Sequence, residues 1–458
     1  MAGIGFELRT LLSNQSLFGM LRAYSFAGAI SSGPWMLTIS SVLAIGILGR
    51  DASDASQQME HFQVSVTYII ATTLIMTGGL QLGLSRFIAD RLFEKQPQHV
   101  LPNLLGAITL TSVVSGLLGT LLATALFAEP LPYRVLLVSN FVTLSNIWIV
   151  VVVLSSLKAY RQVLLSFVLG CTVVVGAALA LRRFGVSGLL FGFLLGHAVL
   201  LFVLLGLVMR RYPGQGLLSF QFLRRRQMYL SLILTGFLYN LAIWSDKFLF
   251  WFNPATSEVV IGPLRASLIY DIPIFLSYLS IVPGMSVFLV RIETDFVECY
   301  DAFYDAVRGG DTLANLQRLK DRMVYVVRQG IYEIFKVQGL TVIVLILCGR
   351  YLLSGLGISP GYLALFYVDL VAAGLQVVLL AVLNIFFYLD QRRTTLLLSL
   401  LFLLLNTLLS WSTQLLGPAL YGYGFAGAML LTCLLGLWLL SARLDALEYE
   451  TFMMQSFA

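Results

Sequence analysis

Residues 187–209 have the sequence SGLLFGFLLGHAVLLFVLLGLVM, which contains no charged side chain, and Arg210 and Arg211 follow directly. An α-helix rises about 1.5 Å per residue, so this run is long enough to cross the roughly 30 Å hydrocarbon core of a bilayer. Basic residues next to a span mark its cytoplasmic end. The stretch therefore predicts a transmembrane helix that ends at an inner membrane boundary.

Eleven further apolar runs of spanning length lie along the chain. With 187–209, the predicted spans are 22–48, 62–84, 102–127, 135–157, 162–181, 229–252, 266–290, 337–356, 362–388, 396–416 and 423–441. Hydrophobic residues make up 59% of the chain and charged residues only 11%, against roughly 25% in soluble proteins. The predicted fold class is an all-α polytopic membrane protein with about 12 transmembrane helices.

The distribution of basic residues predicts the orientation. If the N-terminus is cytoplasmic and the spans alternate, 22 of the 29 Lys and Arg residues fall on the inner side and six on the outer side. This asymmetry follows the positive-inside rule. We expect a bacterial inner-membrane protein with both termini in the cytoplasm, and the net charge of +6 needs no nucleic-acid partner.

Matching motifs suggest that the chain consists of two related halves. The second span ends in Arg86-Phe-Ile-Ala-Asp90 and the eighth in Arg291-Ile-Glu-Thr-Asp295. The sixth span begins near Gly188 and the twelfth near Gly427, each after a short outer turn. Parallel repeats are common in transporters. We therefore expect two pseudo-repeated six-helix bundles around a central cavity.

These boundaries predict the domain organisation. It comprises a cytoplasmic amphipathic N-terminal segment (1–20), a first six-helix bundle (21–210), a cytoplasmic basic linker (211–228), a second bundle (229–441) that includes a cytoplasmic helical hairpin (291–336), and a cytoplasmic tail (442–458).

Polar and aromatic residues within the spans are candidates for a transport path, because an ionisable group in a span usually faces protein or water. The candidates are Asp246, Lys247, Asn240, Trp244, Asp271, Trp35 and Asn146. Adjacent helical residues point about 100° apart, so we expect Asp246 and Lys247 not to pair directly. The alternative is structural, since a charge near a span end can extend to the interface.

Glycine and proline mark two places in the first bundle. Gly33 and Pro34 lie inside the first span, where proline removes a helical hydrogen bond, and we interpret them as a hinge. The alternative is a tolerated kink. Gly188, Gly192 and Gly196 form an i, i+4, i+8 stripe that predicts close packing of two helices.

The longest predicted cytoplasmic segment has apolar residues at helical spacing on two arms, separated by Gly309 and Gly310. The first arm is acidic and the second is basic. The residues predicted to dock a partner are Phe296, Tyr300, Phe303 and Tyr304. The alternative is a connector whose two arms pack only on each other.

Several functional classes lack support in the sequence. No glycine loop of the Walker type is present, and the His and Cys residues have no metal-ligand spacing. No hydrophilic stretch is large enough for a glycosyltransferase domain. We therefore expect no catalytic residue, no metal and no cofactor.

Three N-terminal motifs resemble the inner-membrane transporter family of the Pel exopolysaccharide system. They are Gly3-Ile-Gly-Phe-Glu-Leu-Arg9, Leu21-Arg-Ala-Tyr24 and Ile30-Ser-Ser-Gly-Pro-Trp35. The segment from Asp246 through Val260-Ile-Gly-Pro-Leu-Arg-Ala266 is similar to polysaccharide flippases of the multidrug/oligosaccharidyl-lipid/polysaccharide exporter superfamily.

This resemblance implies translocation of a polymer rich in N-acetylated amino sugars across the inner membrane. It also implies a cytosolic glycosyltransferase and membrane partners that include a cyclic-di-GMP receptor. Two alternatives remain, an ion-coupled exporter of small molecules and a membrane anchor for the glycosyltransferase that transports nothing. The first of these needs a carboxylate deep in the first bundle, and the six spans there contain none.

Overall fold

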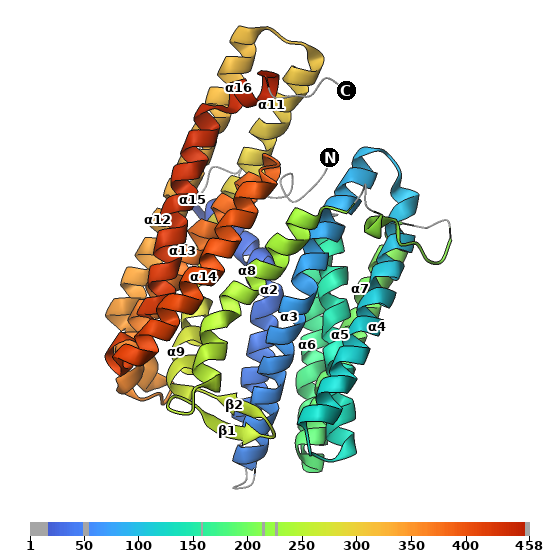
Figure 1. Ribbon diagram of the computed structural model, residues 1–458, viewed down its shortest axis with the longest axis vertical. Coiled ribbons are helices and arrows are strands. Elements are labelled where there is room, and N and C mark those ends of the chain that lie inside the picture. Colours follow the sequence, from blue (N-terminus) through green and yellow to red (C-terminus); the bar gives the residue numbers. More distant parts are fainter. Residues whose placement is uncertain (1–16, 49–54, 157–158, 213–215, 225–227, 454–458) are drawn as a thin grey trace. The chain divides into compact units, whose positions relative to one another are not determined.

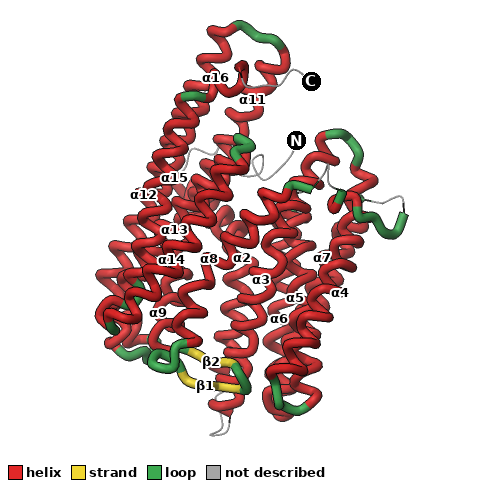
Figure 2. Tube along the Cα trace, viewed as in Figure 1, coloured by secondary structure: helices red, strands yellow, loops and turns green. Residues whose placement is uncertain are grey.

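The computed structural model describes residues 17–48, 55–156, 159–212, 216–224 and 228–453 (Figure 1). It is almost entirely helical, and its one sheet within these ranges is a two-stranded hairpin (Figure 2). The predicted amphipathic segment at the N-terminus lies outside the described residues, apart from the start of α2.

The long helices follow the predicted spans. They are α2 (Leu17–Leu48), α3 (Ala55–Phe93), α4 (Val100–Leu126), α5 (Leu131–Ser156), α6 (Tyr160–Leu181), α7 (Gly185–Arg211), α8 (Leu230–Phe252), α9 (Leu268–Tyr278) with α10 (Val282–Val290), α12 (Leu313–Gly355), α13 (Leu363–Tyr388), α14 (Arg392–Leu416) and α15 (Tyr423–Asp445). Ten stretches of the described chain are long and apolar enough to cross a membrane, and one of them, Arg161–Arg211, contains both α6 and α7. The all-α polytopic fold class is confirmed. Helix α8 is not among the ten stretches, and it is the helix that carries Asp246 and Lys247.

The chain divides by its contacts into two compact units. Unit 2 comprises Gly33–Leu268, and unit 1 comprises Met1–Ser32 together with Ile269–Ala458. The sequence placed the bundle division at the linker 211–228. The contact units differ from this predicted division in two segments. Helix α8 packs on α3 and belongs to unit 2, and the first half of α2 belongs to unit 1.

Unit 2 has an apolar core that runs through α3, α4, α5, α6 and α7. Helices α6 and α7 pack along each other, as the glycine stripe predicted. A Cβ placed on Gly192 would lie 2.4 Å from the backbone nitrogen of Ala178, and one on Gly196 would lie 2.5 Å from that of Val174. No side chain fits between backbones this close, so the stripe sets the packing distance. His197 is buried beside it, with Nδ1 2.9 Å from the carbonyl oxygen of Phe193.

The strands β1 (Glu258–Ile261) and β2 (Leu264–Ala266) form an antiparallel hairpin after α8, also in unit 2. Gly262 makes its turn with a φ of 50°. A Cβ on this glycine would lie 2.8 Å from Oε1 of Glu129, so the turn needs glycine for its conformation and for its close approach.

Unit 1 contains α9 to α16. Helix α13 packs against α12, α14 and α15, and α10 packs against α12. The 3₁₀ turn η4 (Leu279–Ile281) separates α9 from α10, and the π-helical turn η5 (Arg291–Phe296) leads from α10 into α11 (Val297–Gly309). Pro283 at the start of α10 and Pro273 within α9 explain why this span is segmented.

The predicted hairpin is present in unit 1, and its arms continue the flanking spans. Helix α11 ends at Gly310, which has a left-handed φ of 68°, and α12 then begins after Thr312. Asn315 and the Thr312 N–H donate hydrogen bonds to Asp311, and these hold the pKa of its exposed carboxyl below the usual value. The short helix α16 (Leu447–Met453) follows α15, and Lys320 on α12 pairs with its Glu448 at 2.8 Å.

Candidate functional site

Asp246 and Lys247 form a buried ion pair on α8. Their side chains are 0% and 1% exposed, and Nζ of Lys247 lies 3.1 Å from Oδ2 and 3.2 Å from Oδ1 of Asp246. The ammonium also donates to the carbonyl oxygen of Ile243 at 2.8 Å. The expectation that the two charges would not pair is wrong. The four-carbon stem of lysine lets the ammonium fold back along the helix, although the two Cβ atoms diverge.

Aromatic rings lie near this pair. The ring of Trp244, two residues before Asp246, lies 6.1 Å from the ring of Trp251. Trp251 in turn stacks on Tyr68 of α3 at 4.5 Å and meets Phe248 edge-on at 5.3 Å. Trp244 and Trp251 are both buried. This half of α8 therefore combines a neutralised charge pair with a run of flat rings.

The β1–β2 hairpin is tied to the same ring cluster. The hydroxyl of Tyr68 donates to the carbonyl oxygen of Arg265 at 3.0 Å. The Arg265 guanidinium donates to the hydroxyl and carbonyl oxygens of Ser257 at 2.8 and 2.9 Å. Strand β2 is thus fixed to α3. The Arg265 side chain of the same strand also holds Ser257, which lies between the end of α8 and the start of β1.

Asn240 lies where α3 and α8 approach most closely. Its amide donates to the carbonyl oxygen of Gly236 at 2.9 Å. A Cβ on Gly78 would lie 2.4 Å from the amide nitrogen of Asn240, and one on Gly236 would lie 2.2 Å from the Gly78 carbonyl oxygen. Asn240 is half-buried and one helical turn and a half before the ion pair.

Helix α5 supplies three buried or half-buried polar groups. Asn146 donates to the hydroxyl of Ser112 at 2.8 Å, and its own carbonyl oxygen is buried with no hydrogen-bond partner. The amide oxygen of Asn140 is in the same state. The indole of Trp148 donates to Thr73 on α3 at 3.0 Å. An amide oxygen left without a donor inside a membrane protein is costly, so these two positions have unused capacity to bind a polar ligand or water.

The predicted hinge lies where the two contact units meet along the chain. Pro34 is inside α2, and the unit boundary falls between Ser32 and Gly33. A Cβ on Gly33 would lie 2.4 Å from a methyl group of Leu164, so the helix is tightly packed there. Trp35, the residue after Pro34, is half-buried. The hinge function stays a prediction.

The structure places six of the seven path candidates in unit 2. The seventh, Asp271, is half-buried in the first turn of α9 and belongs to unit 1. Within unit 2, Trp244, Asp246, Lys247 and Asn240 share α8, whereas Asn146 lies on α5 and Trp35 on α2. A role of these residues in transport remains a prediction.

The predicted docking residues divide into two pairs. Phe296 and Phe303 are fully buried in unit 1, so they stabilise the hairpin and are not part of a surface that a partner can reach. Tyr300 and Tyr304 are half-buried, with ring centroids 4.5 Å apart. Docking at these two tyrosines stays a prediction.

The two Arg-x-x-x-Asp motifs both form i, i+4 salt bridges. Nε of Arg86 lies 3.2 Å from Asp90, and Nη1 of Arg291 lies 2.7 Å from Asp295. The hydroxyl of Tyr229 donates to Asp90 at 2.6 Å, just before α8 begins. Both motifs therefore form a local ion pair, the first within the α-helix α3 and the second in the π-helical turn η5.

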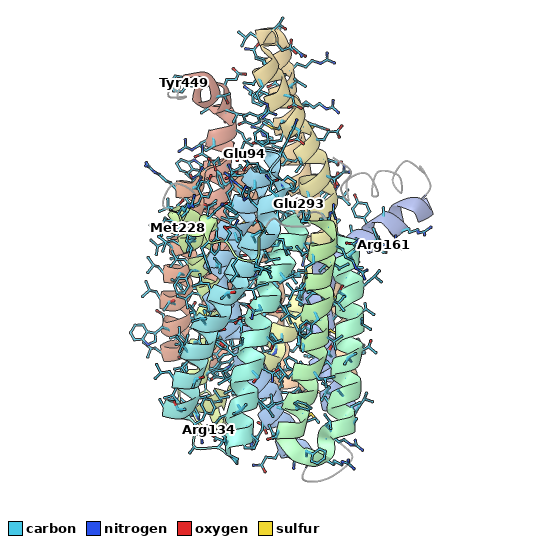
Figure 3. The ribbon with its side chains drawn as sticks, turned by 90° about the vertical axis from the view of Figure 1, so that its right-hand side faces the viewer. Glu94, Arg134, Arg161, Met228, Glu293 and Tyr449 are labelled. Atoms are coloured by element: carbon cyan, nitrogen blue, oxygen red, sulfur yellow. The ribbon has the colours of Figure 1, made fainter. Side chains whose placement is uncertain are left out.

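A polar cluster that the sequence did not predict surrounds Glu293, the residue labelled in Figure 3. Asn384 and Tyr388 of α13 donate hydrogen bonds to its two oxygens, both at 3.0 Å. Two residues before Glu293, Arg291 donates two hydrogen bonds of 2.6 and 3.0 Å to Glu333 of α12. Only the acidic character of the arm was visible in the sequence, because the partners lie more than 40 residues away.

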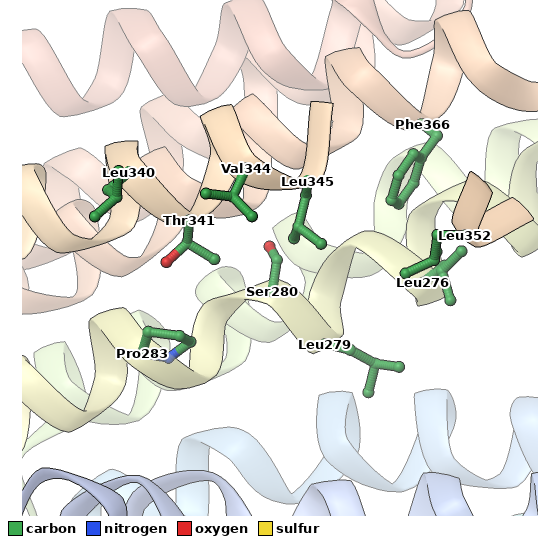
Figure 4. Close-up of a pocket in the computed structure, with 10 residues that line it drawn as sticks. All are labelled: Leu276, Leu279, Ser280, Pro283, Leu340, Thr341, Val344, Leu345, Leu352 and Phe366. Carbon is green, nitrogen blue, oxygen red and sulfur yellow. The ribbon is translucent and has the colours of Figure 1, made fainter. Parts of the chain in front are cut away.

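Unit 1 also has an apolar groove of about 480 Å³ between α9, α10 and α12 (Figure 4). Eight of the ten residues that line it are apolar, and Ser280 and Thr341 are the polar ones. Its rim residues Leu340 and Val344 are 64% and 48% exposed. This lining suits hydrocarbon and offers too few polar groups for a sugar.

The sequence profile of the PelG family, described as "Putative exopolysaccharide Exporter (EPS-E)", matches residues 1–452. The chain belongs to this family. A search of curated protein sequences finds no match. Membership of the PelG family and the long apolar helices both indicate an inner-membrane protein of a transporter family, as the resemblance predicted.

Solved structures of transporters share the fold of this PelG-family chain. A MOP superfamily transporter from Pyrococcus furiosus has a TM-score of 0.63 and 15% identity, with 92% of this chain and 96% of that chain covered. A multidrug resistance MATE family transporter of the MOP superfamily matches in its inward-facing conformation (TM-score 0.65, 14% identity, 91% and 96% covered). A structure of a multidrug resistance MATE family transporter in an outward-facing conformation matches as well (TM-score 0.64, 16% identity, 92% and 96% covered). At these identities the likeness shows the fold and nothing about the cargo.

Proposed function

We propose that this chain moves an exopolysaccharide, a polymer of N-acetylated amino sugars, across the inner membrane in a complex with its glycosyltransferase. The observation that carries the proposal is the buried pair of Asp246 and Lys247 on α8, a helix packed on the spanning helix α3 in a chain of an exopolysaccharide exporter family. Charged groups that are buried in a membrane protein are costly and tend to serve a path for polar cargo. Because the two charges neutralise each other, the site suits a neutral sugar chain.

The surroundings of the pair support the same cargo. A pyranose ring has an apolar face that packs on aromatic rings and hydroxyl groups that bind amides. Trp244 and Trp251 supply rings on α8, and the amide oxygens of Asn140 and Asn146 are buried without hydrogen-bond partners. All of these residues belong to unit 2.

The ion-coupled exporter is the second candidate, favoured only by the MATE-like fold. The described parts of α2 and α4 to α7 contain no Asp or Glu, and the carboxylate of α8 is engaged by lysine. A cation-binding exporter needs a carboxylate that can exchange its partner. The paired state of Asp246 therefore supports the polysaccharide reading over this one.

The finer parts of the proposal concern partners and movement. A cytosolic glycosyltransferase and membrane partners, including a cyclic-di-GMP receptor, would contact the hairpin of α11 and α12 on the cytoplasmic side. Gly33 and Pro34 would act as the hinge, because α2 changes from one contact unit to the other at this point.

Transport can be tested in sealed inside-out vesicles that contain the glycosyltransferase and membrane partners, with and without this chain. Labelled nucleotide sugar is supplied, and protection of the polymer from added glycosidase is measured. We expect protection to require this chain. It should fall with Asp246→Asn at equal expression, and the exposed Glu60→Gln of α3 serves as the matched control. Polymer that is made but stays digestible in every sample would reject transport and favour the anchor.

Loss of the carboxylate leaves Lys247 buried without its ion partner, which could prevent folding. A double variant, Asp246→Leu with Lys247→Met, removes both charges and keeps the volume similar. If this double variant folds and still protects the polymer, the ion pair is structural and is not part of the path.

A further inference from the structure

Five side chains of unit 1 gather where α13 ends and the π-helical turn passes into α11. They are Glu293, Tyr300, Tyr304, Asn384 and Tyr388, and all five are half-buried. They combine three aromatic rings with an amide and a carboxylate. Chain segments about 90 residues apart contribute to the cluster, so it is a product of the tertiary fold.

The carboxylate of Glu293 is held in a fixed orientation. The Asn384 amide donates to Oε1 and the Tyr388 hydroxyl donates to Oε2, each at 3.0 Å. Two donors from successive turns of α13 therefore prevent rotation of the carboxylate. The same tyrosine links the carboxylate to the aromatic part of the cluster.

The three tyrosine rings form a connected series. The ring centroid of Tyr388 lies 5.8 Å from that of Tyr300, which lies 4.5 Å from that of Tyr304. Tyr300 and Tyr304 lie one helical turn apart on α11, whereas Tyr388 lies on α13. The series therefore extends from the Glu293 carboxylate toward the hairpin.

The backbone under Glu293 is irregular. Residues Arg291–Phe296 form a π-helical turn, which is rare in proteins and often occurs at functional sites. Phe296 and Phe303 are fully buried, and they supply the apolar contacts that join α11 to the bundle. The rings of Tyr300 and Tyr388 pack on Phe296 and the ring of Tyr304 packs on Phe303, and each half-buried tyrosine keeps part of its surface exposed.

We propose that this cluster binds a pyranose chain before it enters the membrane part of the protein. The tyrosine rings would pack on the apolar faces of successive sugars, while Glu293 and Asn384 bind hydroxyl or amide groups. Several weak contacts in series suit a cargo that must move on, because tight binding at one place would stop conduction. The inference deepens the proposed function, on which its choice of a sugar ligand rests.

Binding can be measured on the full chain in lipid nanodiscs by saturation-transfer NMR. The probes are two neutral tetrasaccharides, one of N-acetylglucosamine and one of glucose, which separate recognition of the acetamido group from recognition of the pyranose ring. The variants are Tyr300→Ala, Tyr304→Ala, Tyr388→Phe and Glu293→Gln. Tyr325→Ala is the matched control, because Tyr325 is a 67% exposed tyrosine of α12 in the same hairpin.

We expect the two alanine variants to bind the better probe about tenfold more weakly, as loss of a central aromatic contact commonly does. Tyr388→Phe keeps the ring and removes one hydrogen bond to Glu293, so it should fold normally and still weaken binding. Tyr325→Ala should bind like the unaltered chain. Unchanged binding in Tyr304→Ala and Tyr388→Phe would overturn the inference, as would absence of binding by the unaltered chain.

Together with the vesicle experiment, these binding measurements distinguish failure of the sugar-binding site from failure of the transport proposal. If polymer is protected in vesicles but the tyrosine variants bind sugar normally, the site is wrong and transport stands. If the purified chain binds sugar through these tyrosines but never protects polymer, transport is wrong and the site stands. Loss of glycosyltransferase association in Tyr304→Ala, with sugar binding intact, would assign the surface to protein docking instead.

Discussion

The ammonium of Lys247 lies 3.1 Å from a carboxylate oxygen of Asp246, the residue directly before it on α8. Both side chains are fully buried, so neither charge can be left alone without a large desolvation cost. The pair is also joined to the helix backbone through Ile243. The stability of α8 should therefore depend on keeping both charges or neither.

The first prediction concerns this dependence. Asp246→Asn and Lys247→Met should each lower the free energy of unfolding by about 3–5 kcal/mol, because each leaves one buried charge without its ion partner. The double variant Asp246→Leu with Lys247→Met should lose much less than either single variant. Denaturant titration of the chain in mixed micelles measures this difference. Additive losses in the double variant would show that the two charges are not coupled.

A second prediction concerns the contact between α3 and α8. Gly236→Ala should destabilise the chain by about 1–3 kcal/mol, the usual cost of overpacking, because the new methyl group would meet the Gly78 carbonyl oxygen at 2.2 Å. Backbone cannot move aside as a flexible side chain can. Gly206→Ala on α7 is the matched control, since no atom lies within 4 Å of a Cβ there. Equal thermal stability of the two variants would contradict the close approach.

The spans could be predicted from sequence because a long apolar run has few alternatives in a bilayer. The residues at which the helices begin and end could not be predicted in this way. The span predicted over 337–356 is the end of α12 (Leu313–Gly355), and the one over 62–84 is the middle of α3 (Ala55–Phe93). Hydropathy marks where a helix is in lipid, whereas the helix continues into water for as long as its backbone bonds and packing support it.

For the polar residues, the positions could be predicted from the sequence but the interaction partners could not. Asp246, Lys247 and Asn240 stood out because polar groups are rare in spans, yet their partners were not predictable from spacing on one helix. The flexible stem of Lys247 overcame the angular separation of adjacent residues. The site around Glu293 depends on Asn384 and Tyr388, and no local pattern connects positions so far apart in the chain.

The third prediction compares the two Arg-x-x-x-Asp motifs. Arg291 binds both Asp295 and Glu333, so Arg291→Gln leaves two nearby carboxylates without their shared cation. We expect a loss of about 2 kcal/mol, in the range of hydrogen bonds to charged groups. Arg86→Gln should cost about 0.5 kcal/mol, because its salt bridge to Asp90 is a partly exposed i, i+4 pair. Chemical denaturation of both variants measures the difference, and equal losses would contradict the larger network at Arg291.

The last prediction concerns the contact between the hairpin and the C-terminal helix. Lys320 on α12 is 17% exposed and lies 2.8 Å from Glu448 of α16, which is 32% exposed. Lys320→Glu should place like charges together and release α16, which makes the hairpin more sensitive to limited proteolysis. Glu448→Lys should have the same effect. The double variant, Lys320→Glu with Glu448→Lys, restores opposite charges and should recover resistance.

The neighbouring pair of Arg328 and Asp445 provides the control. These groups are 3.5 Å apart and more than 60% exposed, so water screens their attraction. Arg328→Glu should therefore change the rate of proteolysis little. Because the Lys320–Glu448 pair is only partly screened, the difference between the two single variants should persist at 0.5 M salt, where exposed pairs contribute least. If the charge swap fails to recover resistance, α16 is held by its apolar face, through residues such as Leu447, and the ion pair follows from that packing.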